Sequence, residues 1–560
     1  MKLRTLAFTT LLALSSTAAA NAQIMERPVG GDPVRLASGQ VAGSALASGV
    51  RTYFGIPFAA PPLRDLRWRE PQPVQAWTGV REAVAFPPMC PQGMRGPGQN
   101  HYFGAEPTSE DCLYVNVWAP PTSAAQASEG APGAKASKAP VVVWIYGGGF
   151  SGGSASMPWA NGETLASKGV VYVTLNYRLG ALGFMAHPEL TAESPHHASG
   201  DYGHLDQVAA LKWVQDNIAA FGGDADNVTV IGQSAGSMSV SALQASPLSA
   251  GLFHRAIGLS GNVVGAGAGA LATNEAAEAQ GVALQTALGV SSLAEMRRLP
   301  ADRIIGVRGV RTGPSIDGYF MPRPPKEIFA AGEANDVGLL IGFTRDEGFS
   351  PLVQASSAED YQAIARRTYP DQADELLAAY PADANWARNA RDAGRDISLG
   401  MTTRDWAAHQ TRPGRQPAFG YMFSRVHPYA PGVAFIDHDP AAVGAYHAGD
   451  IVYWFGNLDA FNAYRTTRNF TAVDRTLSDT MSNMIVAFAT RGDPSLPGVS
   501  APRYDAKDEK LIELGEHVGP IDWPGRTRFD MLGSLKAQQQ PPSSAAAPAV
   551  GSAPNAGPRF

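Results

Sequence analysis

The chain reads NVTVIGQSAGSMSVSAL over residues 227–243. Four strand-forming residues, 228–231, run directly into the sequence GQSAG at 232–236, and small and apolar residues suited to a helix follow. This order predicts a strand, a sharp turn and a helix. The rest of the chain is organised around this stretch.

A serine on such a turn needs glycine on either side. Gly232 and Gly236 flank Ser234 in this way, because side chains there would strike the neighbouring strand or helix. A helix that begins at the serine directs backbone N–H groups at developing negative charge. The GxSxG pattern alone is a weak signal, and an ordinary turn of small residues between a strand and a helix is the alternative. The surrounding sequence must therefore distinguish a catalytic serine turn from an ordinary turn.

Composition describes a globular protein with a substantial core. The chain has 560 residues, of which 44% are hydrophobic and 17% charged, and its net charge is −6. That length allows one large α/β domain or two closely joined lobes. With 44 Lys and Arg against 50 Asp and Glu, the chain lacks the basic field that nucleic acid or an anionic membrane requires. No nucleic-acid partner is predicted.

The first 22 residues resemble a secretory signal peptide. Lys2 and Arg4 precede a short apolar stretch, and the small residues of ANA at 20–22 predict cleavage after Ala22. The apolar stretch is too short to span a bilayer, and no run of about 18 apolar residues follows it. We therefore expect a secreted or periplasmic protein without membrane insertion.

Low-complexity segments divide the chain that follows the expected signal peptide. Residues 23–536 are expected to form the folded domain, and 537–560, rich in Gln, Pro, Ser and Ala, a disordered tail. The stretch 121–140 is interpreted as an exposed hairpin insertion, and the Gly/Ala-rich stretch 265–272 as a mobile loop.

Strand-like and helix-like patterns alternate along the chain. Apolar residues recur at helical spacing between Val208 and Phe221. The predicted strands, besides 228–231, are 113–118, 141–146, 170–175, 338–342 and 419–423. This alternation predicts a large, mostly parallel central sheet covered by helices on both faces. The active site should lie at the carboxyl ends of its strands, where Ser234 sits.

Three glycines follow the strand at 141–146. Gly147, Gly148 and Gly149 would let the backbone approach a substrate closely. The N–H groups of Gly148 and Gly149, with that of Ala235, would form an oxyanion hole for a reaction at Ser234. The alternative is a flexible loop, but its place directly after a buried strand favours function.

A serine nucleophile also needs a base and an orienting acid. The sequence GFTRDEG at 342–348 offers carboxylates after a strand, and YHAGD at 446–450 offers a histidine later still. Serine, acid and histidine in this chain order are typical of α/β-hydrolases. Spacing alone does not choose among the candidate histidines, which are His187, His196, His427, His438 and His447.

A resemblance to a known family distinguishes among these candidate histidines. The chain resembles the type B carboxylesterases, the family that includes the cholinesterases, from about residue 34 to 532, essentially all of the expected mature protein except its tail. The motifs that carry the resemblance are FGIP at 54–57, SEDCLYVNVW at 109–118, WIYGGGF at 144–150, NYRLG at 176–180, DQ at 206–207, FGGD at 221–224 and GQSAG at 232–236. The resemblance implies an α/β-hydrolase fold, a serine esterase and no metal or cofactor.

The resemblance also implies roles for particular residues. Ser234 matches the family nucleophile, Glu347 the acid and His447 the general base, with Asp346 as the competing carboxylate. The three N–H donors named above match the family's oxyanion hole. Ser260 matches a serine next to the triad, although a buried structural hydroxyl is an equal alternative.

The two cysteines of the chain, Cys90 and Cys112, match a family disulfide that closes a loop over the active-site gorge. Export makes this pairing plausible on its own, with two free thiols as the alternative. A bridge at this spacing would contribute roughly 3 kcal/mol through a more restricted unfolded chain.

The chain departs from the cholinesterases at two places. The residue before the nucleophile is the neutral Gln233, where those enzymes carry a glutamate, and the disulfide loop has Tyr102 and Phe103 but no tryptophan. Choline esters are therefore not the expected substrates.

We accordingly expect a serine hydrolase of uncharged carboxylic esters with a small-molecule substrate. One alternative is a hydrolase specialised for polymer, phenolic or xenobiotic esters, and a lid-gated lipase is disfavoured because no amphipathic lid segment is present. Another is a non-catalytic binding or adhesion protein on the same fold, whose relatives typically lack a triad member. The sequence sets neither the acyl preference nor the oligomeric state.

Overall fold

The structure is a computed structural model. It describes residues 25–29, 31–93, 104–121, 138–265, 271–435 and 438–535. The expected signal peptide, the expected tail, most of the 121–140 insertion and the centre of the 265–272 loop lie outside the described residues.

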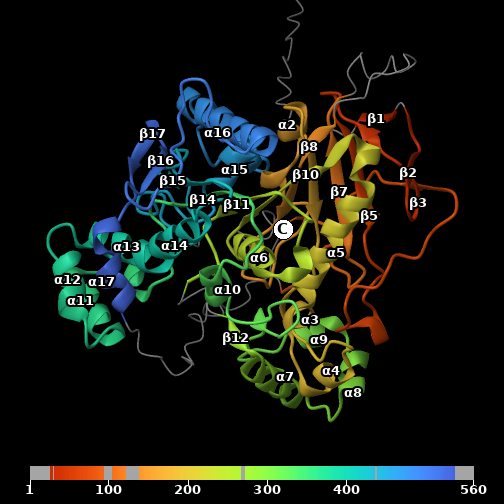
Figure 1. Ribbon diagram of the computed structural model, residues 1–560, viewed down its shortest axis with the longest axis horizontal. Coiled ribbons are helices and arrows are strands. Elements are labelled where there is room, and N and C mark those ends of the chain that lie inside the picture. The colour runs from red at the N-terminus through yellow and green to blue at the C-terminus, as the bar shows by residue number, and fades with distance from the viewer. Residues whose placement is uncertain are drawn as a thin grey trace, which may run out of the picture.

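A twelve-stranded sheet runs through the molecule (Figure 1). It is parallel from β9 to β16 and antiparallel at both margins. In spatial order the strands are β1 (Met25–Pro28), β4 (Ser44–Ala45), β5 (Arg51–Pro57), β7 (Tyr114–Ala119), β9 (Val171–Leu175), β8 (Ala139–Ile145), β10 (Gly223–Gln233), β11 (Arg255–Leu259), β14 (Gly338–Thr344), β15 (Ala418–Phe423), β16 (Lys510–Leu514) and β17 (Val518–Asp522).

Two small sheets lie beside the large one. β2 (Val34–Leu36), β3 (Gly39–Ala42) and β6 (Val80–Glu82) form the first, and β12 (Ala272–Thr273) and β13 (Ser315–Ile316) pair as the second. β12 directly precedes the helical segment 274–305 and β13 follows it, so the second sheet joins the two ends of that segment.

The central strands are buried on both faces, as their sequences predict. All seven residues of β14 and all five of β9 are buried. Near-continuous Val, Ile and Leu runs are what a parallel sheet with two covered faces requires. All six predicted strands are confirmed, and the predicted helix at 208–221 is α5 (Tyr202–Asn217) followed by a 3₁₀ turn.

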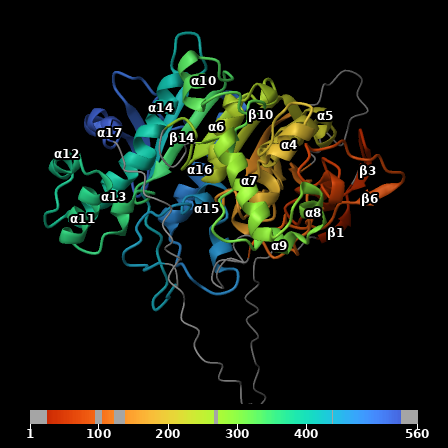
Figure 2. The same ribbon diagram turned by 90° about the horizontal axis from the view of Figure 1, so that it is seen from below.

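Helices cover the two faces of the sheet (Figure 2). On one face lie α5, α6 (Ala235–Ala245) and α14 (Met401–Gln410); on the other lie α15 (Ile451–Trp454) and α16 (Ala472–Arg491). α2 (Glu163–Ser167) packs on β7 and β9 and contacts α16. α6 packs on β10 and β11, and α16 packs on β8 and β10. The predicted α/β class, a mostly parallel sheet flanked by helices, is therefore confirmed.

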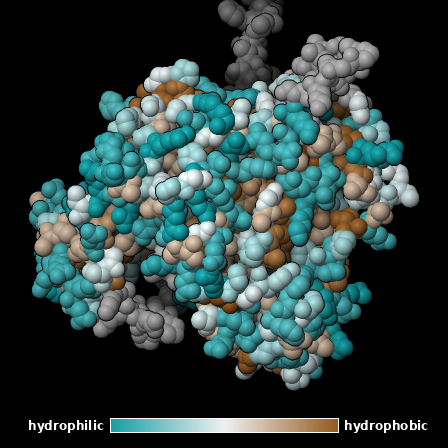
Figure 3. Space-filling model, viewed as in Figure 1, coloured by the Kyte–Doolittle hydropathy of each residue, from teal (hydrophilic) through white to brown (hydrophobic). Residues whose placement is uncertain are grey.

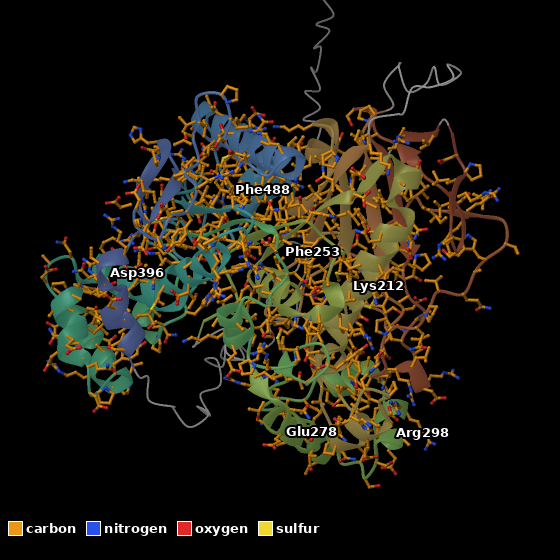
Figure 4. All side chains as sticks on the ribbon, in the orientation of Figure 1. Lys212, Phe253, Glu278, Arg298, Asp396 and Phe488 are labelled. Atoms are coloured by element: carbon orange, nitrogen blue, oxygen red, sulfur yellow. A yellow bond between two sulfur atoms is a disulfide. The ribbon has the colours of Figure 1, made fainter. Side chains whose placement is uncertain are left out.

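Two helical lobes project from the sheet. In Figure 4, Glu278 and Arg298 mark the lower lobe and Asp396 the lobe at the left. The lower lobe contains α3 (Gly180–Phe184), α4 (Pro188–Glu193), α7 (Asn274–Leu288), α8 (Leu293–Arg298) and α9 (Ala301–Ile305). The left lobe contains α11 (Ala358–Thr368), α12 (Ala373–Ala379), α13 (Trp386–Arg395), the π-helix η7 (Asp396–Gly400) and α17 (Phe529–Ser534). α10 (Pro325–Ala331) packs against α6 and α14.

Short 3₁₀ turns complete the described elements. They are η1 (Arg64–Leu66), η3 (Pro158–Ala160), η4 (Ile218–Phe221), η5 (Pro247–Ser249), η6 (Pro351–Gln354), η8 (Leu458–Asn462) and η9 (Arg526–Arg528). Hydrophilic residues dominate the face seen in Figure 3, with hydrophobic residues in small separate groups. Among the described residues, no helix combines the length and apolar character that crossing a membrane demands.

The parallel strands bring several loops to one edge. The segments after β8, β10, β11, β14 and β15 all leave the sheet at its carboxyl edge. Segments more than 100 residues apart in sequence are therefore neighbours there.

Candidate active site

Ser234 lies at the turn between β10 and α6, as predicted. Its backbone has φ 55° and ψ −123°, a conformation that costs free energy for a residue with a side chain. Two hydrogen bonds hold it: the Ser234 N–H donates to the Leu259 carbonyl at 2.8 Å, and the Met238 N–H donates to the Ser234 carbonyl at 2.9 Å. The turn lifts this serine out of the strand at the start of a helix.

The glycines around Ser234 are required by close backbone approaches. A Cβ on Gly232 would lie 2.3 Å from the Gly236 carbonyl oxygen, and a Cβ on Gly236 would lie 2.1 Å from the oxygen of Ile145. Neither position can hold a side chain without moving the backbone of β8 or of the turn itself. The structure thus supplies the physical reason for the GxSxG spacing.

The glycine-rich loop after β8 lies against this turn. A Cβ on Gly147 would be 2.4 Å from the Gln233 carbonyl oxygen and 2.9 Å from the Cβ of Ser234. Gly148 and Gly149 have φ of 119° and 62°, which side chains disfavour. Ala235 is the first residue of α6, so its N–H has no partner within the helix. Ala235 thus follows Ser234 directly, and the glycine loop meets the turn at Gly147; the donor roles of Gly148, Gly149 and Ala235 stay a prediction.

Glu347 lies beside the predicted histidine. It follows β14, is 3% exposed, and accepts a hydrogen bond from the Thr344 N–H at 2.6 Å through Oε1. Its Oε2 accepts a hydrogen bond from Nδ1 of His447. Both carboxylate oxygens are thus held, one by the backbone at the end of the strand and one by the imidazole.

Asp346, the competing carboxylate, faces other partners. It accepts hydrogen bonds from Arg345, Arg388 and the Ala445 N–H, the last at 2.7 Å. Burial opposes its ionisation, but the hydrogen bonds and charges of these partners hold its pKa below the usual value. Asp346 anchors the segment that precedes His447, whereas Glu347 contacts the imidazole.

His447 is the predicted histidine that reaches the turn. Its side chain is 29% exposed, and its Nε2 lies 3.1 Å from the amide nitrogen of Gln233, the residue before Ser234. The ring of Phe349 stands edge-on to the imidazole with centroids 5.0 Å apart. Among the described residues, the Ser234 hydroxyl has no hydrogen bond to His447. Serine-histidine hydrogen bonds are often long or misaligned before substrate binds.

The other candidate histidines are engaged elsewhere. His427 is fully buried and donates through Nε2 to the Gly449 carbonyl at 2.7 Å. Burial, and then the nearby charge of Arg468, lower its pKa to about 3, so it is neutral at working pH. His187 accepts a hydrogen bond at the start of α4, His196 stacks on Tyr319, and His438 is hydrogen-bonded to Tyr429.

Asp450 is a site residue that sequence reasoning did not single out. It is fully buried, and its Oδ2 accepts hydrogen bonds from the Tyr421 hydroxyl at 2.8 Å and the Trp454 indole at 3.2 Å. Burial, and then the charge of Glu347, raise its pKa to about 6. The only sequence signal was its place three residues after His447, in the YHAGD stretch.

Ser260 lies at the carboxyl end of β11, next to the end of β10. It is 1% exposed, has φ 57°, and its N–H donates to the Gly342 carbonyl at 2.8 Å. Within the described part of the chain its hydroxyl has no hydrogen-bond partner. This position fits the predicted neighbour of the triad, and its role stays a prediction.

The predicted disulfide between Cys90 and Cys112 is present, with both residues fully buried. Near it, the Gln92 side chain exchanges two hydrogen bonds with the backbone of Gly153, each of 2.9 Å. The bridged segment is thereby tied to the loop that begins with the three glycines. In the described ranges, no cluster of three or more His, Cys, Asp or Glu side chains is arranged to hold a metal ion.

Comparison with known proteins agrees with this geometry. The model of the carboxylesterase family matches residues 31–522. The chain is 36% identical over 495 residues to the fumonisin B1 esterase of Sphingopyxis macrogoltabida, covering 84% of each chain. It is 33% identical over 500 residues to the para-nitrobenzyl esterase of Bacillus subtilis, covering 86% of this chain and 94% of that one.

The fold is shared with solved structures as well. A structure of PNB esterase superposes with a TM-score of 0.74 at 32% identity, covering 89% of this chain and 99% of that chain. Sequence motifs, strand order and these matches agree, and the chain belongs to the carboxylesterase family of ester hydrolases.

Proposed function

We propose that this carboxylesterase acts through Ser234 as nucleophile, His447 as general base and Glu347 as the acid that orients the base. The observation that carries the proposal is the hydrogen bond from Nδ1 of His447 to Glu347, next to the turn that bears Ser234. Because Nδ1 donates to Glu347, Nε2 is the unprotonated nitrogen and the one that can take a proton, although the Gln233 amide now lies 3.1 Å from it. A serine hydroxyl needs such a base near neutral pH.

The reaction proceeds in two halves. Nε2 of His447 takes the proton of Ser234 as its oxygen attacks the ester carbonyl, and the imidazolium then protonates the departing alcohol. Water attacks the acyl-enzyme by the same steps and releases the acid and the serine. Glu347 holds the imidazole in the tautomer that leaves Nε2 unprotonated and stabilises the charged form of the ring.

The tetrahedral intermediate carries an oxyanion that needs donors. The N–H groups of Gly148, Gly149 and Ala235 take that role in the proposal, and losing one such donor costs roughly 2.7 to 4 kcal/mol of transition-state stabilisation in serine hydrolases. The contacts of Gly147 with Gln233 and Ser234 support it, because they set the glycine loop against the nucleophile.

Uncharged carboxylic esters are the proposed general substrates. The neutral Gln233 next to His447 supports this, since it offers no anion to a cationic alcohol. Relatives named for fumonisin B1 and para-nitrobenzyl esters keep a specialised small-molecule ester open as the natural substrate. A non-catalytic role is disfavoured because all three triad residues are present. We further propose export to the periplasm or medium, from the signal-like residues 1–22.

A panel of p-nitrophenyl esters from acetate to a long-chain acyl group tests this function. The wild type should hydrolyse short esters best, and Ser234→Ala should lower kcat by about 10⁶-fold with unchanged folding. Near-normal turnover by Ser234→Ala would remove the nucleophile assignment. A folded wild type that hydrolyses no ester of the panel would point to a binding role.

A further inference from the structure

A cleft of about 800 Å³ opens beside the glycine-rich loop. Its lining includes Gly149 and Ser151, here called the glycine wall, and Ile305, Val307 and Val310, here called the apolar wall. This volume suits a small-molecule substrate. Because Gly149 is one of the proposed oxyanion donors, a group in this cleft would be joined to the reacting carbonyl. A role for the cleft in substrate selection rests on the proposed function and narrows its substrate class.

The two walls of the cleft come from different parts of the fold. The wall with Gly149 is tied to the disulfide segment by the paired hydrogen bonds of Gln92 and Gly153. The apolar wall follows α9 in the lower lobe, the lobe marked by Glu278 and Arg298 in Figure 4. In the proposed function the reacting end of a substrate lies at Gly149, so the apolar wall is available to the part of the substrate beyond it.

Arg311 is the one charged side chain among the described residues that line this cleft. It is exposed, and its backbone N–H donates to Gln280 Oε1 at 3.3 Å. Its guanidinium makes no hydrogen bond or ion pair to any residue that the structure describes. An exposed arginine without a partner can offer its full fork of N–H donors to a ligand.

The net charge of the whole chain is opposite in sign to the charge of Arg311. The net charge is −6, so the protein as a whole repels anions and a local cation must supply any attraction for them. At the turn, Gln233 is neutral. The cleft therefore combines a neutral reacting end, an apolar wall and one unpaired cation.

We propose that Arg311 binds a carboxylate of the substrate, so that the preferred substrates are esters that carry a free carboxylate on the part lying in the cleft. The scissile ester remains uncharged, and the anion sits beyond an apolar spacer that contacts Val307 and Val310. The general expectation of uncharged esters then describes substrates that the enzyme accepts, and the carboxylate-bearing esters are those it selects.

Two matched pairs of probes place the carboxylate on either half of the ester. For the acyl half, the mono-p-nitrophenyl ester of adipic acid is compared with p-nitrophenyl hexanoate. For the alcohol half, para-acetoxybenzoate is compared with para-acetoxybenzamide. In one of the pairs the wild type should prefer the charged ester, and the preference should fall as salt is added, because it is an exposed charge contact. The pair that responds identifies which half lies in the cleft.

Variants of the same loop separate a binding role from a general one. Arg311→Gln should lower kcat/KM for the charged ester by about tenfold and change it for the neutral partner by less than about twofold. Arg311→Lys keeps the charge without the fork of donors and should restore part of the preference. Arg308→Gln, with the same charge change at an exposed position of that loop outside the cleft lining, should leave both esters unaffected.

Other results would overturn the inference. Equal losses on the charged and neutral esters in Arg311→Gln, or the same loss in Arg308→Gln, would assign the arginine a structural or general electrostatic role. A wild type without preference in either pair, but active on the neutral esters, would reject the inference and leave the esterase proposal standing. No hydrolysis of any probe would reject the esterase proposal first.

Discussion

The carboxylate of Glu347 accepts a hydrogen bond from Nδ1 of His447, a residue 100 positions later in the chain. The same carboxylate accepts the Thr344 N–H, so its orientation is fixed by the end of β14. The imidazole that it holds presents Nε2 toward the turn at Ser234. A strand end, through one side chain, thus sets the position of the proposed base.

Glu347→Gln should lower kcat by about 10⁴-fold, because an amide in place of the carboxylate no longer stabilises the charged imidazole and favours the wrong tautomer. The measurement is steady-state hydrolysis of a neutral p-nitrophenyl ester. Asp346→Asn is the matched control. It should keep kcat within about tenfold while lowering the thermal midpoint, because it weakens the ion pair with Arg388. A larger kcat loss in Asp346→Asn than in Glu347→Gln would reverse the assignment.

Gln233→Glu should move the acid limb of the pH profile of kcat/KM upward by about one pH unit. Its carboxylate would lie near Nε2 of His447, where the Gln233 amide is now at 3.1 Å, and a neighbouring negative charge favours the protonated imidazole. The profile is measured with a neutral ester. Gln233→Leu removes the amide without adding charge and should move the limb much less than Gln233→Glu, and an equal shift in both variants would contradict this explanation.

Replacing Cys90 and Cys112 together by serine should destabilise the protein by roughly 3 kcal/mol, since the bridge closes a 22-residue loop and restricts the unfolded chain. Thermal unfolding of the oxidised wild type and the double variant measures the difference. Reductant should lower the midpoint of the wild type and leave that of the variant unchanged. Equal midpoints without reductant would show that the bridge contributes nothing.

Asp450→Asn should stabilise the protein at pH 8. The pKa of Asp450 in the folded chain is raised to about 6 from the usual 3.8. The favourable contribution of its neutral form is therefore complete below pH 4 and is lost as the pH rises through 6. Above that pH, ionisation of this buried group costs about 3 kcal/mol. The asparagine oxygen can still accept the Tyr421 and Trp454 donors.

Unfolding midpoints of wild type and Asp450→Asn, compared from pH 4 to pH 8, test this linkage. The gap between them should widen in favour of the variant as the pH rises through 6. A gap that is independent of pH would mean that Asp450 does not change its ionisation on folding in this range.

Local sequence was enough to predict the turn at Ser234 and the glycine loop. Gly147, Gly232 and Gly236 each lie where a backbone atom of another residue would come within 2.4 Å of a Cβ. Glycine is therefore required at these positions, and the local motifs show it there. The central strands could also be predicted from the sequence, because burial on both faces demands largely apolar runs such as those of β9 and β14.

Non-local features were out of reach of pattern reasoning. Spacing in the sequence could not show whether Glu347 or Asp346 contacts the histidine. The choice depends on Arg388 and Ala445, which come from distant segments and donate hydrogen bonds to Asp346. The burial of Asp450 under Tyr421 was hidden for the same reason. The antiparallel margin was not predicted either, since the two-residue strand β4 is too short to show a pattern.

Covalent labelling tests the central claim most directly. Wild type and Ser234→Ala are treated with a fluorophosphonate, and the labelled peptides are located by mass spectrometry. We predict one adduct per chain on Ser234, loss of ester hydrolysis in proportion to labelling, and no adduct in Ser234→Ala. An adduct on a different residue, or Ser234→Ala that is still labelled and still hydrolyses esters, would contradict the proposed nucleophile.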